Sequence, residues 1–214
     1  MKNILTILVF AFSSFSIHAQ SARYTEFMKI NIAQLDSAKT PDNFQDIANN
    51  FERIATAEKE QWHPWYYAAY SLAMKSFIIK DKSQVDGICD KADEYLSIAE
   101  SLSNNNSEIT TMKAMLLESR MSVDQSRGMT LGPRTSTLLQ KAIKEEPLNN
   151  PRALTQMAQM TYYTPVAFGG GKEPGLVYLK KAVEAYDTFK PASELDPNWG
   201  KNYAKQLLEE WVNN

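Results

Sequence analysis

The sequence carries TSTLLQKAIKEEPLNNP at residues 135–151 and ALTQMAQMTY at residues 153–162. In both stretches apolar residues recur three and four positions apart, which is the spacing of one buried face of an α-helix. Ala142 and Ala158 are the small residues on these faces, and small residues are needed where neighbouring helices cross closely. Asn150-Pro151 lies between the stretches, and a capping side chain followed by proline is typical of a helix start. The two stretches therefore predict two packed helices joined by a short turn.

The same helical spacing extends over most of the chain. Thr40-Pro41 and Asp196-Pro197 mark further helix starts. No stretch combines strict apolar–polar alternation with β-branched residues, so the expected fold is all-α, without a sheet. The expected helices cover residues 22–38, 42–58, 62–79, 83–102, 107–121, 133–145, 151–163, 174–188 and 198–212. Since no long flexible linker interrupts them, residues 20–214 are expected to form a single domain.

Alanines recur at regular intervals in these helices. The first series consists of Ala69, Ala114 and Ala158, and the second of Ala99, Ala142 and Ala182. Members of the first series are 45 and 44 residues apart, and members of the second are 43 and 40 apart. These intervals indicate an internal repeat of a helix pair.

Residues 62 to about 188 resemble tetratricopeptide repeats. Leu139, Ala142 and Pro147 occupy the large, small and proline positions of the second helix and exit turn of such a repeat. The residues of ALTQMAQMTY, and of WYYAAYSL at residues 65–72, match the spacing of its first helix. Because the period of that family is 34 residues, the longer intervals place extra residues in or beside the turn inside each repeat, where they are expected to form a common rim.

The resemblance implies a right-handed α-solenoid of about four antiparallel helix pairs with lengthened turns within the repeats. Residues 198–212 are expected to form a C-terminal helix that caps the last pair. The whole chain is similar to exported repeat proteins of Gram-negative bacteria. The solenoid implies a long surface on which a partner can bind.

The N-terminus has the pattern of a secretory signal peptide. A basic start at Lys2 is followed by about a dozen mostly apolar residues, which are too few to span a bilayer. We expect residues 1–19 to be removed by cleavage after Ala19. The single cysteine, Cys89, lies on an apolar stripe and is expected to be buried, so no lipid-modified cysteine follows the cut. The mature protein is therefore expected in the periplasm or outside the cell, and not to span a membrane.

The resemblance also implies a binding surface. In tetratricopeptide repeats, positions 2, 5, 9 and 12 or 13 of each first helix line a concave groove. The matching residues here are His63, Tyr66, Tyr70, Met74, Glu108, Thr111, Met115, Glu118, Arg152, Thr155, Gln159 and Tyr162. Tyrosine and methionine offer large adaptable contact areas, and the charged members can orient a peptide.

A second candidate surface is the rim formed by the inserted turns. Its expected members are Arg127, Phe168, Gly169, Gly170, Gly171 and Lys172. The glycine run is not a phosphate-binding loop, because Val166 stands where the first loop glycine belongs and Glu173 replaces Ser or Thr. Arg120, Asp124 and Arg127 are expected to brace the second inserted turn as ion pairs rather than bind an anion.

The composition and motifs argue against several classes of function. With 23 Lys and Arg against 25 Asp and Glu, the chain lacks the basic excess of a nucleic-acid-binding protein. His63 is the only histidine after the signal peptide and has no nucleophile placed beside it in the sequence. One histidine and one cysteine do not make a zinc site. We therefore expect no enzyme activity, no cofactor and no metal.

Two functions are left open. The first is a non-enzymatic scaffold of the bacterial cell envelope that holds a protein or peptide. The alternative is a small-molecule or glycan-binding component of an outer-membrane uptake system, in which Trp62 and Tyr67 stack on sugar rings near the glycine turn. An open groove would favour a peptide and an enclosed aromatic pocket a small ligand. The oligomeric state is not predicted.

Overall fold

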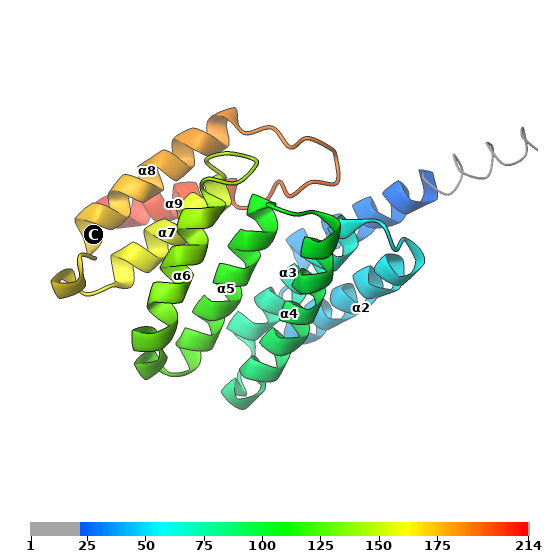
Figure 1. The fold of residues 1–214 in the computed structure, drawn as a ribbon, viewed down its shortest axis with the longest axis horizontal. Coiled ribbons are helices and arrows are strands. Elements are labelled where there is room, and N and C mark those ends of the chain that lie inside the picture. The colour runs from blue at the N-terminus through cyan, green and yellow to red at the C-terminus, as the bar shows by residue number, and fades with distance from the viewer. Residues whose placement is uncertain (1–21, 214) are drawn as a thin grey trace, which may run out of the picture.

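The computed structural model describes residues 22–213, and all regular structure in that part of the chain is helical (Figure 1). The expected signal peptide, residues 1–19, lies outside the described residues. The helices are residues 22–37, α2 (Pro41–Ala57), α3 (Trp62–Ile78), α4 (Val85–Leu102), α5 (Ser107–Val123), α6 (Gly128–Ala142), α7 (Pro151–Tyr163), α8 (Lys172–Thr188) and α9 (Lys201–Asn213). The all-α expectation is confirmed, and no strand occurs in residues 22–213.

Two of the three helix starts expected from a capping residue and a proline are confirmed, at Pro41 and Pro151. Thr40 accepts a hydrogen bond from the Asn43 amide before α2, and Asn150 accepts one from the Arg152 amide before α7. The start expected at Pro133 is wrong, because α6 begins at Gly128 and contains that proline in its interior. The short 3₁₀ helix before Gly128 leads directly into α6, so the proline is not needed to start it.

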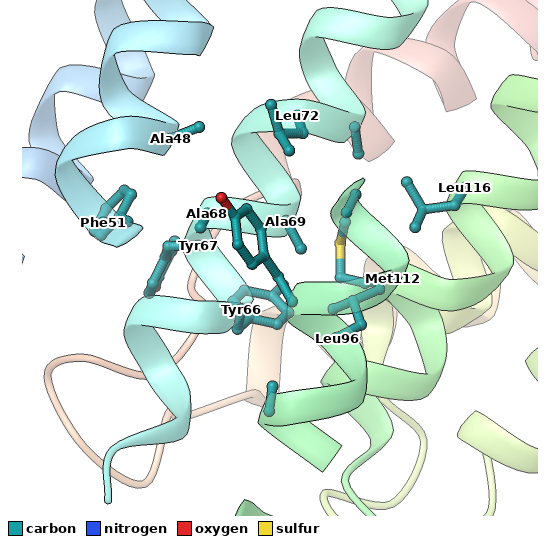
Figure 2. Close-up of a cluster of buried hydrophobic side chains, with 14 of the residues drawn as sticks. Ala48, Phe51, Tyr66, Tyr67, Ala68, Ala69, Leu72, Leu96, Met112 and Leu116 are labelled. Carbon is teal, nitrogen blue, oxygen red and sulfur yellow. The ribbon is translucent and has the colours of Figure 1, made fainter. Parts of the chain in front are cut away.

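Helices that follow one another in the chain pack as neighbours, and α5 also contacts both α3 and α7. The first pair, residues 22–37 with α2, lies at one end of the molecule, and α7 to α9 lie at the other (Figure 1). A main cluster of buried side chains joins α2, α3, α4 and α5 (Figure 2). It includes Phe51 of α2, Tyr66 and Leu72 of α3, Leu96 of α4 and Met112 of α5.

The recurring alanines lie where the packing argument requires. Ala69, Ala114 and Ala158 have no exposed surface, and the same is true of Ala99, Ala142 and Ala182. A larger side chain at these positions would push the helices apart. The prediction that these alanines are buried is therefore confirmed.

The turns inside the three later pairs share one local structure. Each contains a 3₁₀ helix of three residues, at Lys82–Gln84, Gln125–Arg127 and Val166–Phe168. In the first two, Asp81 and Asp124 accept a hydrogen bond from the amide two residues later. These two turns therefore begin with the same side-chain cap.

A long non-helical segment, residues 189–200, separates α8 from α9 (Figure 1). It runs back to α3, where the Leu195 carbonyl accepts a hydrogen bond from the Tyr67 hydroxyl. Gly200 has a φ of 98°, and a Cβ there would lie 2.2 Å from the Tyr186 hydroxyl, so only glycine fits this return. The last helix therefore starts at Lys201, three residues later than expected, and packs its apolar face on α7 and α8 through Ala204, Leu207 and Trp211.

Candidate functional site

The residues expected to line a groove lie on α3, α5 and α7, but the C-terminal part of the chain covers many of them. The Nε2 atom of His63 lies 2.7 Å from the Oδ1 atom of Asp196. Tyr66 accepts a hydrogen bond of 3.0 Å from the Trp199 indole, and Tyr70 stacks on the same ring at 4.7 Å. Farther along, the Gln159 amide donates to the Tyr203 hydroxyl and Tyr162 stacks on Trp211. The segment 189–200 and α9 thus occupy the surface that was expected to receive a partner.

A buried ion pair lies at the centre of this surface. The Arg152 guanidinium is fully buried and donates to both carboxylate oxygens of Glu108, including a 2.7 Å bond from Nε. The rings of Phe189 and Trp199 lie 4.4 and 5.8 Å from the guanidinium carbon. Burial raises the pKa of Glu108, and the neighbouring arginine opposes that rise. Here the two charged groups, which were expected to orient a peptide, neutralise each other.

The expectation of a free groove therefore needs correction. Six of its residues are buried: Tyr66, Glu108, Thr111, Met115, Arg152 and Thr155. The others are partly exposed: His63, Tyr70, Met74, Glu118, Gln159 and Tyr162. The structure places the twelve residues on α3, α5 and α7, and residues 189–200 and α9 pack against several of them.

Among the partly exposed members, Glu118 has an unusual carboxyl group. One of its oxygens is buried and has no hydrogen-bond partner within residues 22–213. Burial raises the pKa of Glu118 to about 8, and its charge acts on the nearby Tyr203 hydroxyl. The carboxyl group is therefore protonated over much of the range in which an ordinary glutamate is ionised.

This carboxyl group leads to a pH-dependent prediction. Between the ordinary pKa of 4.5 and about 8, the unfolded chain releases a proton that folded Glu118 retains, so stability falls as the pH rises through this window. Because glutamine does not ionise, Glu118→Gln removes this fall in stability. We expect it to raise the free energy of unfolding by about 1–2 kcal/mol at pH 8 and to change it little at pH 4. Exposed Glu209→Gln is the control, and equal effects of both variants on thermal unfolding would contradict the prediction.

The expected rim residues serve mainly to build their turns. Arg127 forms two hydrogen bonds to Asp86 of α4, at 2.8 and 2.9 Å, while Asp124 caps its own turn and does not pair with Arg120. Arg120 instead contacts aspartates of α4. Gly169 and Gly171 have φ of 81° and 114°. A Cβ on Gly170 would lie 2.1 Å from the Thr164 carbonyl oxygen, so the glycine run is required by the turn itself. Phe168 is 72% exposed, and Lys172 begins α8.

The aromatic platform expected for a sugar is not present. Tyr67 is 2% exposed, and Trp62 stacks on His63 with ring centroids 4.1 Å apart. The expectation that Trp62 and Tyr67 are both exposed is therefore wrong, because α3 turns Tyr67 into the main cluster.

An open groove lies elsewhere, on the outer side of the first helix pair. We call it the hairpin groove; it has a volume of about 650 Å³. Its lining comes from two antiparallel helices: Arg23, Tyr24, Phe27, Ile30, Asn31 and Gln34, and, from α2, Asn50, Arg53, Ile54, Ala57 and Glu58. These residues lie three and four positions apart, so each helix presents one continuous face to the groove.

The hairpin groove combines exposed apolar side chains with polar groups. Phe27 and Ile30 are 44% and 47% exposed, although both are large and apolar. Asn31 of the first helix accepts a 2.9 Å hydrogen bond from Asn50 of α2, which joins the two walls. The Tyr24 hydroxyl is buried and has no hydrogen-bond partner among the described residues. Burial, and secondarily Glu58, raise the pKa of Tyr24, so its hydroxyl is a hydrogen-bond donor at neutral pH.

None of the binding residues expected from the sequence lies on this pair of helices. The sequence feature that could have indicated the hairpin groove is the presence of two apolar faces on the first helix. Met28 is fully buried against the main cluster, whereas Phe27 and Ile30 project outward. A helix that serves only to bury one face needs no second apolar face.

The packed helix pairs and the open groove define an all-helical protein with a surface suited to a small apolar ligand. None of the helices within residues 22–213 is both long and apolar enough to cross a membrane. Among solved structures, the chain is similar to one described as HusA haemophore from Porphyromonas gingivalis, with 36% identity and a TM-score of 0.81. The match covers 89% of this chain and 93% of that chain. The chain belongs to the HusA family. No protein-family model matches the sequence, and no curated protein matches it.

Proposed function

We propose that this protein is a non-enzymatic binding protein of the bacterial envelope or exterior, and that its cargo is a haem-type tetrapyrrole held in the hairpin groove. The observation that carries the proposal is the groove itself, with Phe27 and Ile30 exposed, in a chain 36% identical to a haemophore. Its volume of about 650 Å³ is in the usual range for small-ligand sites, about 300–1,000 Å³.

The lining matches the chemistry of a tetrapyrrole. A flat apolar macrocycle covers Phe27, Ile30 and Ile54, which removes apolar surface of both partners from water. The Tyr24 hydroxyl gains an acceptor or a water that it lacks within the described residues. The scaffold we propose is a right-handed solenoid of tetratricopeptide type, supported by the contacts of α5 with both α3 and α7. The peptide-binding alternative has less support, because residues 189–200 already cover much of the surface it needs.

The test is a haem titration followed by visible absorption and by quenching of tryptophan fluorescence. Phe27→Ala combined with Ile54→Ala removes apolar contact on both walls of the groove. We expect haem affinity to fall about ten-fold or more, the equivalent of about 1.4 kcal/mol. The matched control is Val177→Ala on α8, where the side chain is 53% exposed and lies outside the groove. If the double variant binds haem as tightly as the wild type, the assignment of the groove is wrong.

A further inference from the structure

We propose that Arg23 and Arg53 determine which ligands the hairpin groove accepts, by pairing with two carboxylates on the edge of the flat apolar ligand. This inference rests on the proposed function and extends it to the recognition of the ligand's acidic groups. Both arginines line the groove, one from each wall. A tetrapyrrole of the haem type carries two propionate groups on one edge, so it presents both charges on the same side of the ring.

The two arginines are spaced along the hairpin. Asn31 and Asn50 face each other through their hydrogen bond. With a rise of about 1.5 Å per residue, Arg53 lies about 4–5 Å beyond that bond and Arg23 about 12 Å beyond it, in the same direction. The separation of about 8 Å along the helices is within the combined reach of two arginine side chains and two propionate arms. The apolar pair Phe27 and Ile54 lies between these levels, where the ring of the ligand would rest.

Both guanidinium groups are held at the groove by uncharged neighbours. Arg23 lies over the Phe27 ring at 5.4 Å, and Arg53 donates a hydrogen bond to the Asn50 side-chain oxygen. No carboxylate within residues 22–213 forms a salt bridge with either one. Glu58 also lines the groove. With two arginines and one glutamate, the charged side chains that line the groove carry one net positive charge.

Three of the four other arginines are used differently. Arg120, Arg127 and Arg152 are each paired with aspartate or glutamate, and these pairs brace the packing of the helices. Arginine is suited to recognising carboxylates because its planar fork donates two parallel hydrogen bonds. Two such groups beside exposed apolar side chains therefore match an amphiphilic diacid better than a purely apolar ligand.

The experiment compares haem with its dimethyl ester, which has the same ring and no free carboxylate. Each is titrated into the wild type and into the variants Arg23→Gln, Arg53→Gln and the double variant. We expect the wild type to prefer haem, each single substitution to weaken haem binding about ten-fold, and ester binding to change less than two-fold. Added salt should weaken the binding of haem more than that of the ester. The exposed Arg134→Gln on α6 is the matched control for loss of charge.

The outcomes separate this inference from the proposed function. If the wild type binds haem and the ester equally and the glutamine variants do not discriminate, the arginine assignment is overturned while haem binding stands. If the wild type binds neither, the proposed function fails and this inference fails with it. Arg23→Lys with Arg53→Lys keeps both charges without the fork, and partial recovery of the preference for haem supports the assignment. Circular dichroism of each variant shows whether the helices are retained.

Discussion

Replacing Arg152 with alanine is expected to destabilise the protein by about 3–5 kcal/mol, the usual cost of removing one partner of a buried ion pair. The substitution leaves the Glu108 carboxyl group, itself 4% exposed, without its counter-charge. It also removes the cation beneath Phe189 and the donor to the Trp199 carbonyl. Denaturation with urea, followed by circular dichroism, measures the change in the free energy of unfolding.

A double-mutant cycle separates the ion pair from the packing around it. Glu108→Gln removes the charge that Arg152 neutralises, so the effects of the two substitutions should not add. We expect a coupling energy of about 2 kcal/mol or more. Lys201→Ala is the control, because Lys201 and Asp187 form a pair whose side chains are 45% and 55% exposed. That variant should lose less than about 1 kcal/mol. A loss of similar size for Arg152→Ala would show that the buried pair does not stabilise this surface.

The helices could be predicted because their signals are local. Apolar spacing and the caps at Thr40 and Asn150 act within a few residues, so the sequence alone indicates where most helices begin. The helical spacing also predicted the burial of Ala69, Ala114 and Ala158, because they lie on the apolar faces of their helices.

The packing of residues 189–200 and α9 over α3, α5 and α7 could not be predicted in the same way. Several groove positions carried over from the resemblance contact a common segment, but that segment is residues 189–200 and α9 of the same chain. The contact between His63 and Asp196 joins residues 133 positions apart, and no local pattern in either segment records it. Arg152 and Glu108 likewise looked like charged surface residues until the packing of Trp199 and Phe189 showed why they are buried.

The hairpin groove was missed for a different reason. The repeat resemblance begins at residue 62 and assigns no binding position to the first pair, and one apolar face is sufficient for a helix that only packs on its neighbours. Whether Phe27 and Ile30 are covered by another helix depends on the path of the rest of the chain. Only the folded arrangement shows that they remain exposed beside Arg23 and Arg53.

The second large effect is expected at Trp199, which anchors the covering segment. Trp199→Ala removes the stack on Tyr70 and the hydrogen bond to the Tyr66 hydroxyl. We expect a loss of about 3 kcal/mol, somewhat below the largest values for tryptophan because the side chain is partly exposed. For a chain of this length that corresponds to a fall in melting temperature of about 6–12 °C. Trp199→Phe keeps an aromatic ring and loses only the indole donor, so it should cost about 1 kcal/mol.

Hydrogen exchange distinguishes loosening of the covering segment from general destabilisation. If residues 189–200 are held chiefly by Trp199, the alanine variant should exchange faster in that segment and in the first turn of α3, where His63 contacts Asp196. Exchange in α4 should change less, because α4 packs on α3 and α5. A uniform increase across all helices would mean that the segment is an inseparable part of the core. A local increase would mean that residues 189–200 can detach from α3, α5 and α7 while the rest of the protein stays folded, and that Trp199 sets the free energy of this local opening.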